Sequence, residues 1–473
     1  MLLSFEHTLN GLAYLFREKR NIELPCDFRS SIQNMTLFAN NENNSLAVKK
    51  LEDFCFENIR LLQLVNKIIP DGILPNGYTG ILHDIKVKKG NDPDDKIYSD
   101  YPEIQKLFPR GITTMILKKG DEEKKDVAIY ANRKFIEVED EDDQKSTDKK
   151  WGKYFLENPN NAFKIICTEK LNGEAVHFSA RYIDGKFYLI TGSKNVHLLI
   201  GEKKDIDTYT EEKYRNAKLF ARSVFDMLEI IPEKERQLFF SFLHHTKVTA
   251  VCEILQPDYQ HIVPLSHLEK SQLNLLTFTP TASGDNHHFY PSLTAFPPHY
   301  CLMLGEIFGF PIPSWTVIYS THLDDHLQKI KGYHNKEGDV LYFMNKDGNT
   351  IGISKAKSVW YIFLRALREK SCYTFVGSKK KYPFYKLEEG IKLLKERYDE
   401  IMTRLHISMG CVNEWKSLSV AFMEWLEDKI KRGELRGDEM RPKFPVWWKK
   451  FLNEKGLDDD FLFCYEEFPI LSQ

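Results

Sequence analysis

Residues 163–194 read FKIICTEKLNGEAVHFSARYIDGKFYLITGSK. Three runs within them, FKIICTEK, EAVHFSARY and KFYLITGS, are rich in β-branched and aromatic residues, and this favours β-strands. Asn172-Gly173 and Asp184-Gly185 separate the runs and are typical of two-residue hairpin turns. The pattern therefore predicts three consecutive strands joined by tight turns, with Lys170 beside the first turn.

Strand and helix patterns alternate outside this stretch. Residues 248–255 (VTAVCEIL) and 340–357 predict further strands, whereas residues 47–67, 211–245 and those from 358 onward show helical periodicity. We expect an α+β fold, in which a core of antiparallel sheets and helices lies between a mostly helical N-terminal region and an all-helical C-terminal domain. The expected division is 1–95 for the N-terminal extension, 96–365 for the core and 366–473 for the C-terminal domain.

The composition is that of a soluble globular protein of more than one domain, with 473 residues, 28% charged residues and a net charge of -2. This balance excludes a polybasic protein that coats nucleic acid by bulk charge. No apolar run approaches the roughly 18 residues of a transmembrane helix, so no membrane partner is expected. Eight scattered cysteines without a CxxC motif indicate free thiols, and hence a cytoplasmic or nuclear protein.

Charged residues suited to catalysis or ligand binding occur in and at the ends of the predicted strands. Lys170-Leu171-Asn172-Gly173 matches a motif in which a lysine amine attacks the α-phosphate of a nucleotide. Lys194 follows the third strand and brings a second cation to the same sheet edge. Glu253 lies in an apolar strand, where a buried carboxylate needs a partner such as a ribose hydroxyl or a basic side chain.

A later hairpin carries a further set. Glu337-Gly338 opens it, and Lys355 and Lys357 end it. Residues two apart in a strand point to one face, so the two lysines are expected to reach the same phosphate.

The order of these motifs resembles that of the covalent nucleotidyltransferase superfamily, which holds DNA ligases, RNA ligases and capping guanylyltransferases. Three details are similar to the phage-type RNA ligase 1 family, which includes the ligase modules of fungal tRNA ligases. They are KAKSVWY at 355–361, EILQP at 253–257 continuing to Ile262-Val263, and Pro109-Arg110-Gly111. The resemblance covers about residues 100–365.

The resemblance implies that Lys170 reacts with ATP to form a lysyl-adenylate, and that Glu253 holds the ribose. It implies a site for Mg²⁺, or alternatively Mn²⁺, at Glu337. The nucleotide-binding residues that it implies are Arg110, Lys134, Glu169, Lys194, Glu253, Lys355 and Lys357. The clustered cations are expected to lower the pKa of Lys170.

One departure from the family pattern follows Lys134-Phe135, where Ile136-Glu137 replaces the usual Phe-Asn. Residues 137–150 are almost wholly charged or polar, which predicts a solvated surface loop.

The implied function is an ATP-dependent RNA ligase that joins 5′-phosphate and 3′-hydroxyl RNA ends in RNA repair or tRNA splicing. The chain has no GxxxxGK[ST] motif, so a P-loop kinase is not expected, and RNA ends would arrive phosphorylated or be healed by separate enzymes. Residues 378–386 and 441–451 are basic and aromatic, which fits either RNA binding or a solvated helix flank with buried aromatics. Two alternatives remain, a GTP-using capping-type guanylyltransferase and a non-catalytic RNA-binding protein on a ligase-like core.

Overall fold

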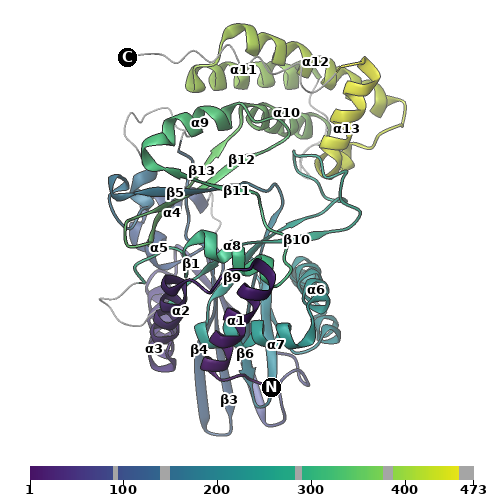
Figure 1. Cartoon of the computed structure of the whole chain (residues 1–473). Coiled ribbons are helices and arrows are strands. Elements are labelled where there is room, and N and C mark those ends of the chain that lie inside the picture. The colour runs from purple at the N-terminus through teal and green to yellow at the C-terminus, as the bar shows by residue number, and fades with distance from the viewer. Residues whose placement is uncertain (89–93, 139–149, 283–289, 377–386, 458–473) are drawn as a thin grey trace.

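The computed structural model describes residues 1–88, 94–138, 150–282, 290–376 and 387–457. Over these residues the fold is α+β, as expected, with three sheets whose strands all pair antiparallel. Helices α1 (Phe5–Arg20) and α7 (Glu233–Thr246) lie at one end of the molecule, and the described helices between residues 359 and 455 gather at the other (Figure 1). None of the described helices is long and apolar enough to cross a membrane.

The first sheet contains β1 to β4 in chain order, with bounds Leu62–Ile68, Tyr78–Val87, Ile112–Lys119 and Glu122–Tyr130. It joins residues on both sides of position 95, and its strands β1 and β2 lie in the N-terminal region 1–95 that the sequence predicted to be mostly helical. The helix expected over 47–67 is wrong beyond Glu57, where α3 (Asn41–Glu57) ends. Pairing of β1 with β2 takes precedence over the helical spacing of its apolar residues.

The second sheet has the order β10-β9-β6-β7-β8 and the third the order β11-β5-β12-β13. The strands expected around 163–194, 248–255 and 340–357 are confirmed. The bounds in the second sheet are Gln272–Thr279 for β10, Thr249–Leu255 for β9, Glu174–Ile183 for β6, Lys186–Ser193 for β7 and His197–Ile200 for β8. Those in the third are Trp315–Tyr319 for β11, Lys164–Glu169 for β5, Gly338–Met344 for β12 and Thr350–Lys357 for β13.

The two predicted turns have different outcomes. Asp184-Gly185 forms the hairpin between β6 and β7, and both residues have positive φ, 45° and 89°. Asn172-Gly173 does not form a hairpin, because β5 and β6 belong to different sheets. The segment after Lys170 is instead a crossover between the second and third sheets.

The described residues after 358 are helical, as expected, and build their own apolar core around Trp360, Trp415, Phe422 and Trp448. Their helices are α10 (Val359–Phe375), α11 (Leu387–Leu405), α12 (Met409–Lys431) and α13 (Met440–Lys455). The remaining α-helices are Cys26–Phe38, Asp94–Asp100, Pro102–Leu107, Arg215–Ile230, Pro298–Ile307 and Leu323–Lys331. Short 3₁₀ turns span Lys150–Tyr154, Pro159–Asn161, Lys203–Thr208, Glu212–Tyr214, Ser320–His322 and Gly437–Glu439.

Candidate active site

The crossover after β5 ties three parts of the chain together at Lys170. The backbone N–H of Lys170 donates to the carbonyl of Gly338 at 2.8 Å. The buried Asn172 side chain donates to Glu337 at 2.6 Å and accepts from the backbone N–H groups of Ile262 and Val263 at 2.8 and 3.0 Å. This asparagine therefore fixes Lys170 relative to the start of β12 and to the loop after β9.

Gly173 is required by the close approach of the crossover to β9. A Cβ atom at this position would lie 2.1 Å from the carbonyl oxygen of Ile254 on β9. The backbone N–H of Gly173 donates to the Glu253 carboxylate at 2.9 Å. The glycine thus lets the crossover lie directly against β9, beside that carboxylate.

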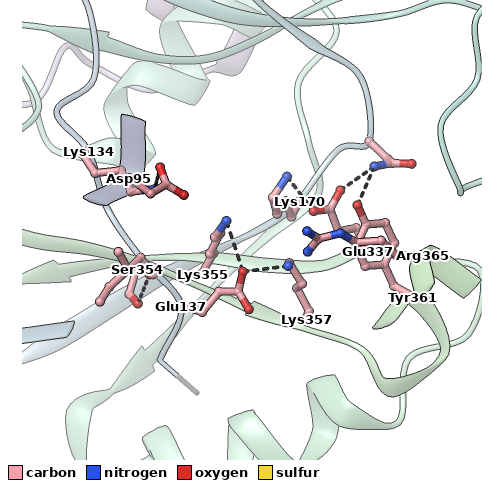
Figure 2. Close-up of polar contacts among 12 residues, drawn as sticks. Asp95, Lys134, Glu137, Lys170, Glu337, Ser354, Lys355, Lys357, Tyr361 and Arg365 are labelled. Carbon is pink, nitrogen blue, oxygen red and sulfur yellow. Dashed lines mark hydrogen bonds and ion pairs between the residues drawn. The ribbon is translucent and has the colours of Figure 1, made fainter. Parts of the chain in front are cut away.

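Lys170 and Glu337 form an ion pair with 2.9 Å between Nζ and Oε1, and the Glu337 side chain is only 4% exposed (Figure 2). Burial disfavours the charged lysine, but the carboxylates of Glu337 and Glu253 outweigh burial and raise its pKa above the ordinary value. The expectation that neighbouring cations lower this pKa is therefore wrong. The charges nearest to Lys170 are carboxylates, which the order of motifs along the sequence could not reveal.

Lys355 and Lys357 contact the same anion, as the strand geometry predicted, but that anion is a residue of this chain. Their ammonium groups lie 3.3 and 2.7 Å from the carboxylate of Glu137 (Figure 2). Burial alone would raise the pKa of Glu137, but the two lysines outweigh burial and lower it. The site thus contains a cluster of two lysines and one carboxylate, in which Lys357 is buried and the other two side chains are partly buried.

Glu137 lies on an extended segment beside β13. Val138 N–H donates to the Lys355 carbonyl at 2.9 Å, and Lys355 N–H donates to the Ile136 carbonyl at 3.2 Å. The expectation of a solvated loop is therefore wrong for Glu137, and residues 139–149 lie outside the described residues. Ile136 and Val138 pack into the core on either side of Glu137, and this apolar alternation is the sequence signal that could have identified the segment.

Glu253 projects from β9 toward the same place. Burial raises the pKa of its carboxyl group to about 7, although Lys170 and the Gly173 N–H oppose the shift. Lys194 lies on the exposed turn after β7, at the same end of the second sheet, because Ser193 pairs with Val176 and Glu253 pairs with Ala175.

Arg110 and Lys134 are brought together by one carboxylate, that of Asp95. Lys134 lies 2.5 Å from Asp95, and Arg110 contacts both Asp95 and Asp94. Burial and the charge of Arg110 lower the pKa of Lys134, against the attraction of Asp95. Asp94 and Asp95 thus balance the charges of these two cations, and Lys355 acts electrostatically on the same Asp95.

The Glu169 side chain has different neighbours from Lys170. It accepts from Ser314 at 2.7 Å and pairs with Lys336 at 3.1 Å. Consecutive strand residues point to opposite faces, which explains the separation.

Within the described part of the chain, no three acidic, histidine or cysteine side chains gather as a complete set of metal ligands. Glu337 and Glu253 offer hard carboxylate oxygens beside Lys170, and each acts electrostatically on that lysine. These residues fit Mg²⁺ or Mn²⁺, which favour oxygen ligands and usually retain water and substrate phosphate oxygens.

The segment 441–451 belongs to α13, and its aromatic residues are buried. Trp447, Trp448 and Phe451 are 4%, 2% and 0% exposed, so base stacking on them is excluded in this conformation. Lys449 and Lys450 are exposed and line a groove with Gln260 and Ser266. The second predicted segment, 378–386, lies outside the described residues.

No known protein family's sequence profile matches the chain, and no curated protein matches it in sequence. Among solved structures, it is similar to an archaeal ATP-dependent RNA ligase, with a TM-score of 0.39, 13% identity, and coverage of 75% of this chain and 77% of that one. It is also similar to two mutant forms of a Naegleria gruberi RNA ligase with ATP and Mn, with TM-scores of 0.29, identities of 12% and 13%, and coverage of 64% of this chain and 97% of theirs. These similarities are weak, and the assignment of a function depends on the residues of the site.

Proposed function

We propose that the protein is an ATP-dependent RNA ligase that joins 5′-phosphate and 3′-hydroxyl RNA ends through a lysyl-AMP intermediate. The observation that carries the proposal is the convergence of Lys170, Glu253, Glu337, Lys355 and Lys357 from two different sheets. Burying several lysines and carboxylates is costly for a fold. A site that handles phosphate groups gives this arrangement a chemical use.

In the proposed first step, the Nζ atom of Lys170 attacks the α-phosphorus of ATP. A P–N bond forms, the bond to the bridging oxygen breaks, and pyrophosphate leaves. The AMP group then passes from Lys170 to an oxygen of the RNA 5′-phosphate as the P–N bond breaks. Finally an RNA 3′-hydroxyl attacks the phosphorus of that 5′-phosphate, a phosphodiester bond forms, and AMP leaves. Lys355 and Lys357 would stabilise the charge that develops on the phosphate oxygens, which is the main requirement in phosphoryl transfer.

Lys170 must lose a proton before it attacks, although Glu337 favours its charged form. A divalent cation held by Glu337 would cancel the carboxylate charge that favours the ammonium. In this proposal Asn172 keeps Glu337 within reach of Lys170, and Arg110 and Lys134 bind the outer phosphates.

The test is incubation with α-labelled ATP and Mg²⁺, followed by a denaturing gel. We expect covalent label on the parent, and none on Lys170→Ala. Lys164→Ala is the matched control, because it removes a lysine from the other end of β5. Label retained by Lys170→Ala would refute the assignment, and a stronger signal from GTP than from ATP would favour the guanylyltransferase alternative.

A further inference from the structure

The loop that follows β9 connects the candidate active site to helix α13. Its Ile262 and Val263 backbone N–H groups bind Asn172, as described above. Two residues earlier, Gln260 N–H donates to the Pro442 carbonyl of α13 at 3.0 Å. Residues 259–261 therefore lie between Lys170 and the groove that carries Lys449 and Lys450.

Two aromatic rings stand at this junction. Tyr259 is 40% exposed, and its ring lies 5.7 Å from that of His261. The Nε2 atom of His261 is buried and has no hydrogen-bond partner among the described residues. Burial lowers the pKa of His261 to about 4, so its imidazole is neutral at neutral pH and can donate or accept.

Helix α10 presents arginines to the same junction. Tyr361, Arg365 and Arg368 are spaced i, i+4 and i+7, so they share one face of the helix. Asn172 donates to the Tyr361 hydroxyl at 3.4 Å, which turns this face toward the active site. Figure 2 shows Arg365 beside Tyr361 and Glu337, and the Arg368 guanidinium donates to the Arg441 carbonyl of α13 at 3.1 Å.

We propose that Tyr259, His261, Arg365 and Arg368 form a subsite for the 5′-phosphorylated end of an RNA strand. This proposal rests on the proposed ligase function, and the subsite is the surface that positions the RNA end beside the lysyl-AMP. The ring of Tyr259 stacks on a base near the end of the strand, and the His261 ring, packed edge-on against it, positions that tyrosine. The two guanidinium groups pair with the terminal phosphate, because their planar, forked N–H donors match the spacing of phosphate oxygens.

The chemistry explains why cations other than the ATP-binding lysines are needed. An oxygen of the terminal 5′-phosphate attacks the adenylate phosphorus, a P–O bond forms, the P–N bond to Lys170 breaks, and the lysine amine takes up a proton. A terminal phosphate carries close to two negative charges at neutral pH. The arginines of α10 would hold this charged group in position while Lys355 and Lys357 remain on the adenylate phosphate.

The test is the binding of a fluorescent single-stranded RNA, prepared with either a 5′-phosphate or a 5′-hydroxyl, followed by anisotropy. We expect Tyr259→Ala to weaken binding of both RNAs about tenfold, as loss of a stacked base does, and Tyr259→Phe to restore it. Tyr14→Ala is the matched control, because Tyr14 is an exposed tyrosine on α1, at the opposite end of the molecule. Thermal unfolding of each variant checks that it is folded.

Arg365→Gln and Arg368→Gln are expected to remove most of the preference for the phosphorylated RNA. The subsite is refuted if folded Tyr259→Ala binds both RNAs like the parent, or if the preference for the 5′-phosphate persists in both arginine variants. Lysyl-AMP formation by the parent is scored separately. If the parent forms no adenylate but Tyr259→Ala weakens RNA binding, the ligase proposal is refuted and the subsite is supported. If the parent forms the adenylate but Tyr259→Ala leaves RNA binding unchanged, the ligase proposal is supported and the subsite is refuted.

Discussion

Replacement of Glu137 by glutamine should strengthen nucleotide binding while weakening the fold. The Glu137 carboxylate contacts Lys355 and Lys357, the two lysines that would bind ATP phosphates in the proposed function. A phosphate group must displace it from both lysines or share them with it. Glutamine keeps the shape and a hydrogen-bond acceptor but loses the charge that competes with phosphate.

The magnitude follows from the two contacts. A hydrogen bond to a charged group contributes about 1.5–3 kcal/mol, so relief of the competition should increase ATP affinity about ten- to a hundred-fold. The stability of the free protein should change in the opposite direction. Lys357 is only 4% exposed and Lys355 is 24% exposed, and removal of one partner from a buried ion pair typically costs about 3–5 kcal/mol.

The assay uses an ATP analogue with a methylene group between the α- and β-phosphorus atoms, which cannot release pyrophosphate. Calorimetric titration gives its affinity, and urea unfolding without the analogue gives the free energy of unfolding. Glu202→Gln is the matched control, because Glu202 also pairs with two lysines, at 2.6 and 2.7 Å, but is exposed. It lies at the end of the second sheet that is farther from Glu253 and the candidate active site. Unchanged or weaker analogue binding by Glu137→Gln would refute competition and make Glu137 a residue that positions the lysines.

Three further outcomes are expected. Burial raises the pKa of Glu253 to about 7, so the parent protein loses stability as pH rises from about 4 to 7 and this buried carboxyl group ionises. Glu253→Gln cannot ionise, so the melting temperature of the variant minus that of the parent should increase over the same pH range. Gly173→Ala places a Cβ atom 2.1 Å from a backbone carbonyl and should cost about 1–3 kcal/mol of unfolding free energy or more. Gly11→Ala should cost less, because its Cβ atom meets only the side-chain tip of Leu238 and alanine favours the helix in which it lies. Replacement of Lys449 and Lys450 by glutamine should flatten the log–log salt dependence of RNA binding by about 0.7 per lysine, and an unchanged slope would place the RNA elsewhere.

Local patterns predicted the strands well, because hairpins and alternating apolar residues are encoded within a few neighbouring positions. The pairing of Lys355 and Lys357 on one face followed from the same period of two. The crossover at Asn172-Gly173 could not be predicted in this way. The dipeptide is a strong hairpin signal, whereas the contacts that hold the crossover come from residues distant in the sequence, among them Ile262, Val263 and Glu337, which bind the Asn172 side chain.

The electrostatics of the site were less accessible to sequence. The sequence motifs identified the cations, but they could not show which carboxylate lies next to each cation in the folded protein. Glu137 is the clearest case, since its acidic neighbours after residue 138 favour a solvated loop, while Ile136 and Val138 attach it to β13. The predicted direction of the Lys170 pKa shift was wrong for the same reason, because Glu337 lies 167 positions away in the chain but only 2.9 Å away in space.

These pairs share one physical logic. Glu337 holds Lys170, Glu137 holds Lys355 and Lys357, and Asp95 holds Lys134 and Arg110. The buried Lys134 and Lys357 need such partners for the protein to fold without a ligand, so in the proposed function nucleotide binding exchanges one anion for another. That exchange releases carboxylates next to the incoming phosphates, where a divalent cation is the natural partner for both. Nucleotide and metal should therefore act together on Lys170, because the phosphates take over its neighbouring lysines while the metal withdraws the carboxylate charge that keeps it protonated.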